Sequence, residues 1–163
     1  MLHLLNDRRW GQVLVFVKTR KGAEQLVTAL LARGISADAI HGDKSQQQRT
    51  EALEAFKSGA VRVLVATDVA ARGLDIEDLP FVINFELPHN AEDYVHRIGR
   101  TGRAGRSGEA ISLMAPEERG RVADIEKLIR KEIEPATPEG FDPGRARQRE
   151  ARESSPREGR GGE

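Results

Sequence analysis

The sequence contains no cysteine and no long apolar run, and each absence excludes a class of protein. Without cysteine the chain forms neither disulfides nor thiolate sites, a composition that fits a reducing compartment. No apolar run approaches the ~20 residues that a helix needs to cross a bilayer, and the chain has no signal peptide. We therefore expect an intracellular, cytoplasmic protein.

Metal ligands and a net charge are also missing. The four histidines include no i, i+4 pair of the kind that binds zinc on a helix, so we assign no metal site. Lysine plus arginine number 26, equal to aspartate plus glutamate, so any affinity for nucleic acid must come from where the charges lie. With 163 residues the chain fits one domain that needs no disulfide or metal to fold.

Positive charge is concentrated in one stretch, residues 96–108, which reads HRIGRTGRAGRSG and holds no acidic residue. Its four Arg-x-Gly repeats carry Arg97, Arg100, Arg103 and Arg106. Glycines let the backbone approach a ligand closely, and guanidinium groups match phosphate oxygens two at a time. Disordered RNA-binding tails also carry Arg-Gly repeats, but here apolar residues enter the motif at helical spacing and an apolar run follows it. We interpret the stretch as an ordered phosphate-binding site.

Apolar runs alternate with amphipathic segments over residues 1–134. The runs predict strands at 13–17, 37–40, 61–66, 81–85 and 110–113. We expect helices after Thr19 as far as Gly34, from Ser45 to about Lys57, from Asn90 into the arginine motif, and over 116–132. Residues 1–10 are interpreted as the end of a helix that begins outside this chain. Strands that alternate with helices predict an α/β fold with a mainly parallel sheet covered on both faces.

Polar clusters follow three strands of this expected sheet. Ligands of parallel sheets bind outside the carboxyl ends of the strands, so we expect the clusters to share one functional edge. They are Thr19-Arg20, His41-Gly42-Asp43 and Thr67-Asp68. Plainer roles stay open for single residues. Asp43 suits a turn, Gln47 and Gln48 suit the cap of a helix, and Thr67 suits backbone satisfaction at a strand end.

Composition changes at Pro135, beyond which proline, glycine, arginine, glutamate and serine replace almost all apolar residues. We expect a domain over residues 1–134 and a disordered tail over 135–163. Residues 142–163 hold six arginines against five acidic residues. A solvated tail is therefore at least as good an interpretation as an RNA-binding arm.

Four motifs, in this order, resemble the C-terminal RecA-like domain of DEAD-box RNA helicases, and within them the RhlE-like bacterial group. They are VLVFVKTR at 13–20, HGD at 41–43 with Gln46-x-x-Arg49, ATDVAARGLDI at 66–76 and YVHRIGRTGRAG at 94–105. The flanking elements fit from about residue 1 to 134. The resemblance implies a three-layer α/β/α RecA-like domain with a mainly parallel sheet, and an ATP-dependent enzyme that separates RNA strands.

The resemblance also implies roles around ATP. Arg100 and Arg103 would be exposed arginine fingers that reach across an interdomain cleft and stabilise charge developing on the γ-phosphate. Asp75 would accept hydrogen bonds from the ribose. The other members of the ATP-binding and coupling region would be Asp68, Gly73 and His96.

A second set of residues would face RNA. The residues that would contact or order the sugar-phosphate backbone are Thr19, Arg20, Gln46, Arg49 and Thr67. Contacts of that kind carry little sequence information. Arg72 would buttress the interdomain face, Arg97 would be structural, and Arg106 would be a solvated or RNA-proximal charge.

Two motifs of the resembled family are missing. No Gly-Lys-Ser or Gly-Lys-Thr is present to hold the β- and γ-phosphates and magnesium, and no Asp-Glu dipeptide occurs. In the family both belong to the N-terminal RecA-like domain. We therefore expect half of an enzyme that is inactive alone, whose partners are RNA, ATP and that domain, with Mg²⁺ held by the other domain and with no membrane partner.

The residues also bear on two other functions. A stand-alone RNA-binding or regulatory module has no need of Arg100, Arg103 and Asp75 together. A dinucleotide-binding domain is disfavoured because no Gly-x-Gly-x-x-Gly follows the first strand.

Overall fold

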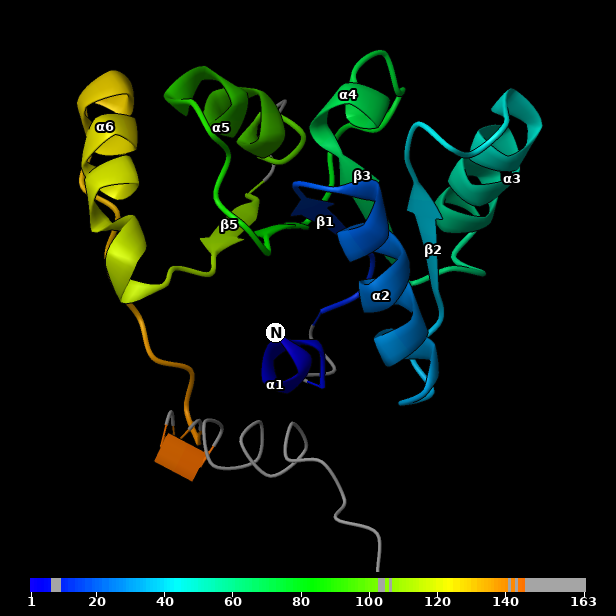
Figure 1. Cartoon of the computed structure of the whole chain (residues 1–163), viewed down its shortest axis with the longest axis horizontal. Helices are drawn as coiled ribbons and strands as arrows, with labels where there is room; N and C mark the ends of the chain where they lie inside the picture. The colour runs from blue at the N-terminus through cyan, green and yellow to red at the C-terminus, as the bar shows by residue number, and fades with distance from the viewer. Residues whose placement is uncertain (7–9, 103–104, 106, 141, 143, 146–163) are drawn as a thin grey trace, which may run out of the picture.

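Five parallel strands form one sheet in the order β2-β3-β1-β4-β5 (Figure 1). The computed structural model describes residues 1–6, 10–102, 105, 107–140, 142 and 144–145. The strands are Val13–Val17 (β1), Ala37–Ile40 (β2), Val63–Thr67 (β3), Phe81–Asn84 (β4) and Glu109–Ser112 (β5). The predicted α/β fold with a parallel sheet is therefore confirmed. Strands β1 and β2 have the predicted bounds, and the bounds of β3, β4 and β5 shift by one or two residues.

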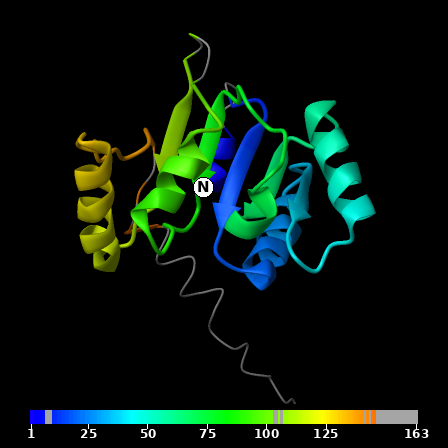
Figure 2. The same cartoon turned by 90° about the horizontal axis from the view of Figure 1, so that it is seen from above.

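Helices lie on both faces of this sheet (Figures 1 and 2). They are Leu2–Leu5 (α1), Arg20–Leu31 (α2), Gln46–Lys57 (α3), Asp68–Ala71 (α4), Ala91–Ile98 (α5) and Arg119–Ile129 (α6). Helices α1 and α2 share a core with one face, whereas α3 and α4 share a core with the other. Helices α5 and α6 pack on each other through Tyr94 and Ile125. No helix of the described residues is long and apolar enough to cross a membrane.

The central strands β1 and β3 are buried along their whole length. In β1, Val13 and Val15 belong to the core with α2, and Leu14 and Phe16 belong to the core with α3. Successive side chains of a strand point to opposite faces, so an uninterrupted apolar run satisfies a strand that is covered on both sides. This is why the run at 13–17 predicted the centre of the sheet.

Side-chain caps begin three of the helices. The Thr19 hydroxyl accepts the amide of Gly22 at 3.0 Å, and the Asn90 side chain accepts the amide of Asp93 at 2.9 Å. Ser45 and Gln48 form the predicted capping box of α3. The plainer role of Gln48 is thereby confirmed, and these caps satisfy amides that have no partner inside their helices.

Two elements differ from the prediction. The short helix α4 directly follows β3 and was not expected. The helix expected over 116–132 is instead a 3₁₀ turn at Pro116–Glu118 followed by α6. It ends early because Arg130 adopts a left-handed conformation with φ 53°. Residues 146–163 of the expected tail lie outside the described residues.

Arg62 fastens the first residues of the chain to the sheet. Its guanidinium Nη2 donates to the carbonyl oxygens of Leu5 and Trp10, both at 2.6 Å. The Trp10 ring stacks on Phe81 with 4.1 Å between centroids. The Arg62 side chain thus joins α1 and the segment before β1 to the start of β3.

Replacing Arg62 with alanine is expected to lower the free energy of unfolding by about 2–3 kcal/mol, because charged hydrogen bonds to partly buried carbonyls are lost. Urea denaturation of the whole chain measures the change. Arg33→Ala is the matched control, since the Arg33 side chain is exposed and, among the described residues, bonds only the Ala29 carbonyl of α2, at 3.2 Å. Equal stabilities for the two variants would contradict the role given to Arg62.

Candidate functional site at the carboxyl edge of the sheet

The three polar clusters lie at the same edge of the sheet, as the sequence predicted. In the strand register Val17 pairs with Thr67, and Ile40 pairs with Ala66. The chain therefore leaves β1, β2 and β3 on the same side, directly before the three clusters. Their side chains separate into two groups of contacts, one around the loop of residues 41–45 and one around Arg97.

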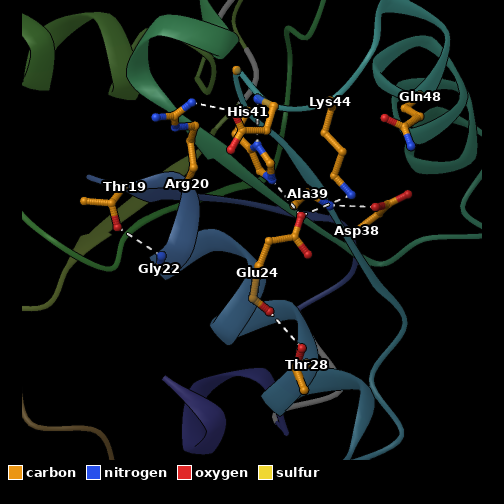
Figure 3. A network of polar contacts seen from close by, with 12 residues as sticks. Thr19, Arg20, Gly22, Glu24, Thr28, Asp38, Ala39, His41, Lys44 and Gln48 are labelled. Atoms are coloured by element: carbon orange, nitrogen blue, oxygen red, sulfur yellow. Dashed lines mark hydrogen bonds and ion pairs between the residues drawn. The ribbon is translucent and has the colours of Figure 1, made fainter.

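The 41–45 loop is held to α2 by Glu24 (Figure 3). His41 Nε2 lies 2.6 Å from Glu24 Oε1, and Lys44 Nζ lies 3.1 Å from the same oxygen. His41 Nδ1 accepts the amide of Asp43 at 3.2 Å. Because Nδ1 is an acceptor, Nε2 carries the ring hydrogen and donates to Glu24.

Hydrogen bonding keeps Glu24 ionised. The bond from His41 is the main cause that lowers the pKa of the Glu24 carboxyl, partial burial acts in the opposite direction, and Lys44 lowers the pKa further. An ionised Glu24 at neutral pH can accept from both residues of the loop.

Four of the five expected RNA-facing residues lie around this loop. Arg20 pairs with Asp43, and Arg49 donates to the carbonyls of Lys44 at 3.2 Å and Gly42 at 3.5 Å. Thr19 caps α2, and Gln46 is the exposed first residue of α3. Arg20 of α2 and Arg49 of α3 thus contact the same loop, and Thr19 and Gln46 stand at the starts of the two helices.

Thr67 lies apart from them. It is the last residue of β3 and is buried, so little of its surface is open to a ligand. This placement favours the plainer interpretation, in which Thr67 belongs to the strand end.

The second group surrounds Arg97, of which 1% is exposed. Its Nε and Nη2 donate to the two carboxylate oxygens of Asp68 at 2.6 and 2.7 Å. Its Nη1 donates to the Glu86 carbonyl at 2.6 Å, and the guanidinium lies 5.1 Å from the centroid of the Phe16 ring. These contacts fit the structural role expected for Arg97, and they engage both oxygens of Asp68.

Arg100 is half-buried, so the expectation of an exposed side chain was wrong. Its Nη1 donates to the Leu74 carbonyl at 2.8 Å and its Nη2 to the Ala71 carbonyl at 3.1 Å. The guanidinium thereby binds the backbone of the turn that follows α4. Gly73 has φ +77° in this turn, a conformation that glycine adopts at little cost. The other expected finger, Arg103, and the neighbouring Arg106 lie outside the described residues.

Asp75 follows Arg100's backbone partner Leu74 and points into solvent. Its side chain is 91% exposed and lies 3.3 Å from Lys57 Nζ of α3. Asp75, the residue expected to bind the ribose of ATP, thus lies next to the turn that Arg100 contacts. The side chains of Asp75 and Arg100 do not bond each other.

His96 lies with Arg100 at a shallow pocket between α4 and α5. Arg72 lines the same pocket and pairs with Asp93 at 3.2 Å. The pocket measures about 20 Å³, room for about one water molecule. No three histidine or acidic side chains gather as metal ligands within the described part of the chain.

Sequence reasoning missed Glu24 and Lys57. Glu24 belongs to no motif, and its only signal is that it flanks Ala23, a residue of the buried stripe of α2. Lys57 was noted only as the end of a helix. Each acts through a partner 17 or 18 positions along the chain, a separation that local patterns do not reveal.

Comparison with known proteins agrees with this geometry. The helicase conserved C-terminal domain family matches residues 1–105. The chain is 46% identical over 142 residues to the DEAD-box ATP-dependent RNA helicase CshA of Geobacillus kaustophilus and 49% identical over 133 residues to the ATP-dependent RNA helicase DeaD of Mycobacterium tuberculosis. These alignments cover 87% and 82% of this chain but only 30% and 24% of the relatives.

Solved structures are similar as well. The Escherichia coli DEAD-box protein SrmB, bound to the regulator of ribonuclease activity A, superposes with a TM-score of 0.79 at 38% identity, over 87% of this chain and 86% of that chain. A DEAD box protein from the hyperthermophile Methanococcus jannaschii gives 0.78 at 43% identity, over 83% of this chain and 38% of that chain.

Proposed function

This chain belongs to the helicase C-terminal domain family as found in DEAD-box RNA helicases and has their RecA-like fold, and from this premise we propose that it forms the C-terminal half of an ATP-dependent RNA helicase. The observation that carries the proposal is the arrangement of arginines at one sheet edge. Arg20 and Arg49 lie around the 41–45 loop, and Arg100 lies on the turn that contains Asp75. One group suits the RNA backbone and the other suits ATP.

On the ATP side, this chain contributes charge and orientation to a site completed by a second domain. The pocket beside Arg100 is far too small for a nucleotide, and the sequence has no Walker A loop. ATP therefore lies between two domains in our proposal. Arg100 leaves its carbonyl partners and, with Arg103, stabilises charge developing on the γ-phosphate, while Asp75 accepts from the ribose.

His96 and Asp68 would couple the ATP site to the RNA site. Asp68 does so through Arg97, which bonds both of its carboxylate oxygens and also the Glu86 carbonyl beyond β4. The described residues offer no set of ligands that fits Mg²⁺, so the ion would be held by the N-terminal domain.

On the RNA side, the proposed contacts are with the sugar-phosphate backbone. Guanidinium groups of Arg20 and Arg49 match phosphate oxygens, and the hydroxyl of Thr19 and amide of Gln46 suit the same backbone. Such contacts position a strand without reading its bases. Thr67, buried at the end of β3, would order this edge and not contact RNA directly.

A cytoplasmic location and the RhlE-like subgroup stay predictions.

The test is an ATPase assay with and without single-stranded RNA. The chain is assayed alone and mixed with the N-terminal RecA-like domain of a DEAD-box helicase that is shown to be folded. We expect hydrolysis only in the mixture and only with RNA. ATPase activity of this chain alone would overturn the half-enzyme proposal. An inactive mixture, with RNA bound by the chain alone, would favour a stand-alone RNA-binding module.

A further inference from the structure

Glu24 joins the two helices that carry the proposed RNA contacts. Thr19 and Arg20 stand at the start of α2, whereas Gln46 and Arg49 belong to α3. We propose that Glu24 and His41 are positioning residues that set the separation of these two groups, so that both meet one RNA backbone at the same time. This inference rests on the proposed function.

Glu24 reaches the loop at two points. Its Oε1 receives the ring hydrogen of His41 at 2.6 Å and the ammonium of Lys44 at 3.1 Å, so the start and the fourth residue of the 41–45 loop converge on one oxygen (Figure 3). Arg20 adds a third tie from α2 to the loop through Asp43. Three side-chain contacts from α2 thus hold a loop that no strand pairing constrains.

His41 makes this tie rigid. It is buried at 3% exposure, and its two ring nitrogens work in opposite directions, since Nδ1 accepts the Asp43 amide and Nε2 donates to Glu24. The ring itself is almost closed to water, whereas the Glu24 side chain that it contacts is 49% exposed. A single imidazole therefore fixes the backbone of the loop and its distance from α2.

The loop in turn fixes α3. The carbonyls of Gly42 and Lys44 both accept from Arg49, and Ser45 begins α3 directly after Lys44 with its capping box. A displaced loop therefore carries Gln46 and Arg49 with it. The physical path runs from Glu24 through His41 and Lys44 to Arg49, with a hydrogen bond or ion pair at every step.

Two hypotheses for Glu24 predict opposite changes in RNA affinity. In one it acts only through its charge, and in the other it positions the two groups of RNA contacts. A carboxylate beside a polyanion site repels RNA, so removing its charge should strengthen binding if charge were its only effect. If Glu24 holds the two groups at the right separation, removing it should weaken binding despite the more favourable net charge. The sign of one affinity change therefore decides between the two.

The experiment measures binding of a fluorescently labelled single-stranded RNA to the whole chain by anisotropy, over a range of salt concentrations. Glu24→Ala is expected to weaken binding about tenfold and to reduce the slope of log affinity against log salt by about one, the effect of losing about one phosphate contact. Glu24→Gln keeps an acceptor for His41 and is expected to recover most of the affinity. Glu51→Ala is the matched control, because Glu51 is an exposed carboxylate of α3 whose partner is Gln47.

One histidine variant separates the two bonds of the ring. Asparagine at position 41 can accept the Asp43 amide but cannot reach Glu24, so His41→Asn is expected to bind RNA as weakly as Glu24→Ala. Thermal unfolding of each variant shows whether it is folded at the temperature of the assay. In the reconstituted enzyme, Glu24→Ala should raise the KM for RNA and leave kcat unchanged, a split that general loss of folded protein would not produce.

Opposite results would overturn the inference in distinguishable ways. If Glu24→Ala binds RNA as tightly as the wild-type chain, or more tightly, while Arg49→Ala binds weakly, the RNA surface stands and the positioning role is wrong. If Arg49→Ala and Arg20→Ala leave RNA binding unchanged, the RNA surface itself is wrong, and the inference falls with it.

Discussion

Replacing Arg100 with alanine is expected to lower RNA-stimulated ATP hydrolysis by the reconstituted enzyme about 10³-fold, the scale of effect that arginine fingers have in phosphoryl transfer. The proposed reason is loss of a guanidinium that stabilises charge on the γ-phosphate. In the structure this group donates to the carbonyls of Ala71 and Leu74, so binding to phosphate exchanges these bonds for stronger ones to a charged acceptor. Single-turnover hydrolysis at saturating RNA and ATP measures the effect on the chemical step.

The position of Arg100 adds a cost in stability that an exposed finger would not have. Losing its bonds to the turn after α4 is expected to lower the free energy of unfolding by about 1–2 kcal/mol. The cost stays modest because the Leu74 carbonyl also accepts the Ile76 amide at 3.0 Å. Urea denaturation of the variant separates this cost from the loss of catalysis.

Arg121→Ala is the matched control for Arg100→Ala. Arg121 is an arginine of α6, 40% exposed and paired with Glu118, and it does not line the pocket at Arg100. We expect its ATPase to equal that of the wild-type protein. If the ATPase activity of Arg100→Ala stays within about twofold of the wild-type activity, Arg100 is a structural residue of the turn. Other residues must then stabilise the charge on the γ-phosphate.

Replacing Arg97 with alanine is expected to lower the free energy of unfolding by about 3–5 kcal/mol. The substitution removes a buried guanidinium and leaves the Asp68 carboxylate, of which 25% is exposed, without its bidentate partner. The Glu86 carbonyl loses its 2.6 Å bond at the same time. Urea denaturation monitored by circular dichroism measures the loss.

A double-mutant cycle isolates the ion pair. Asp68→Ala in the Arg97→Ala background is expected to cost less than it does alone, because the carboxylate is then no longer buried unpaired. Arg97→Lys should restore little, since an ammonium group cannot match both carboxylate oxygens. Additive costs for the two alanine substitutions would show that Arg97 stabilises the fold through its other contacts and not through Asp68.

Expectations drawn from the sequence agree best with the structure where the cause lies within a few residues. The apolar run at 13–17 became a strand with the predicted bounds, and Ser45 with Gln48 began α3 as a capping box. The one clear error at the site, the exposure of Arg100, concerns a side chain whose partners are 24 to 29 positions away. The unexpected α4 is a single turn that follows a buried strand, and it carries too few residues to show a helical period.

By itself the sequence determined the alternation of strands and helices, the caps, and the edge on which the polar clusters lie. All of these follow from local chemistry, since side-chain periodicity and capping hydrogen bonds act over a few residues. Only the tertiary structure decided which polar side chains meet, because the order β2-β3-β1-β4-β5 places β3 between β2 and β1 and brings segments far apart in the chain together. Glu24 with His41, Asp68 with Arg97, and Lys57 with Asp75 are pairs of this kind. A bond between charged groups needs both partners within about 3 Å, and that distance is set by the packing of the whole sheet.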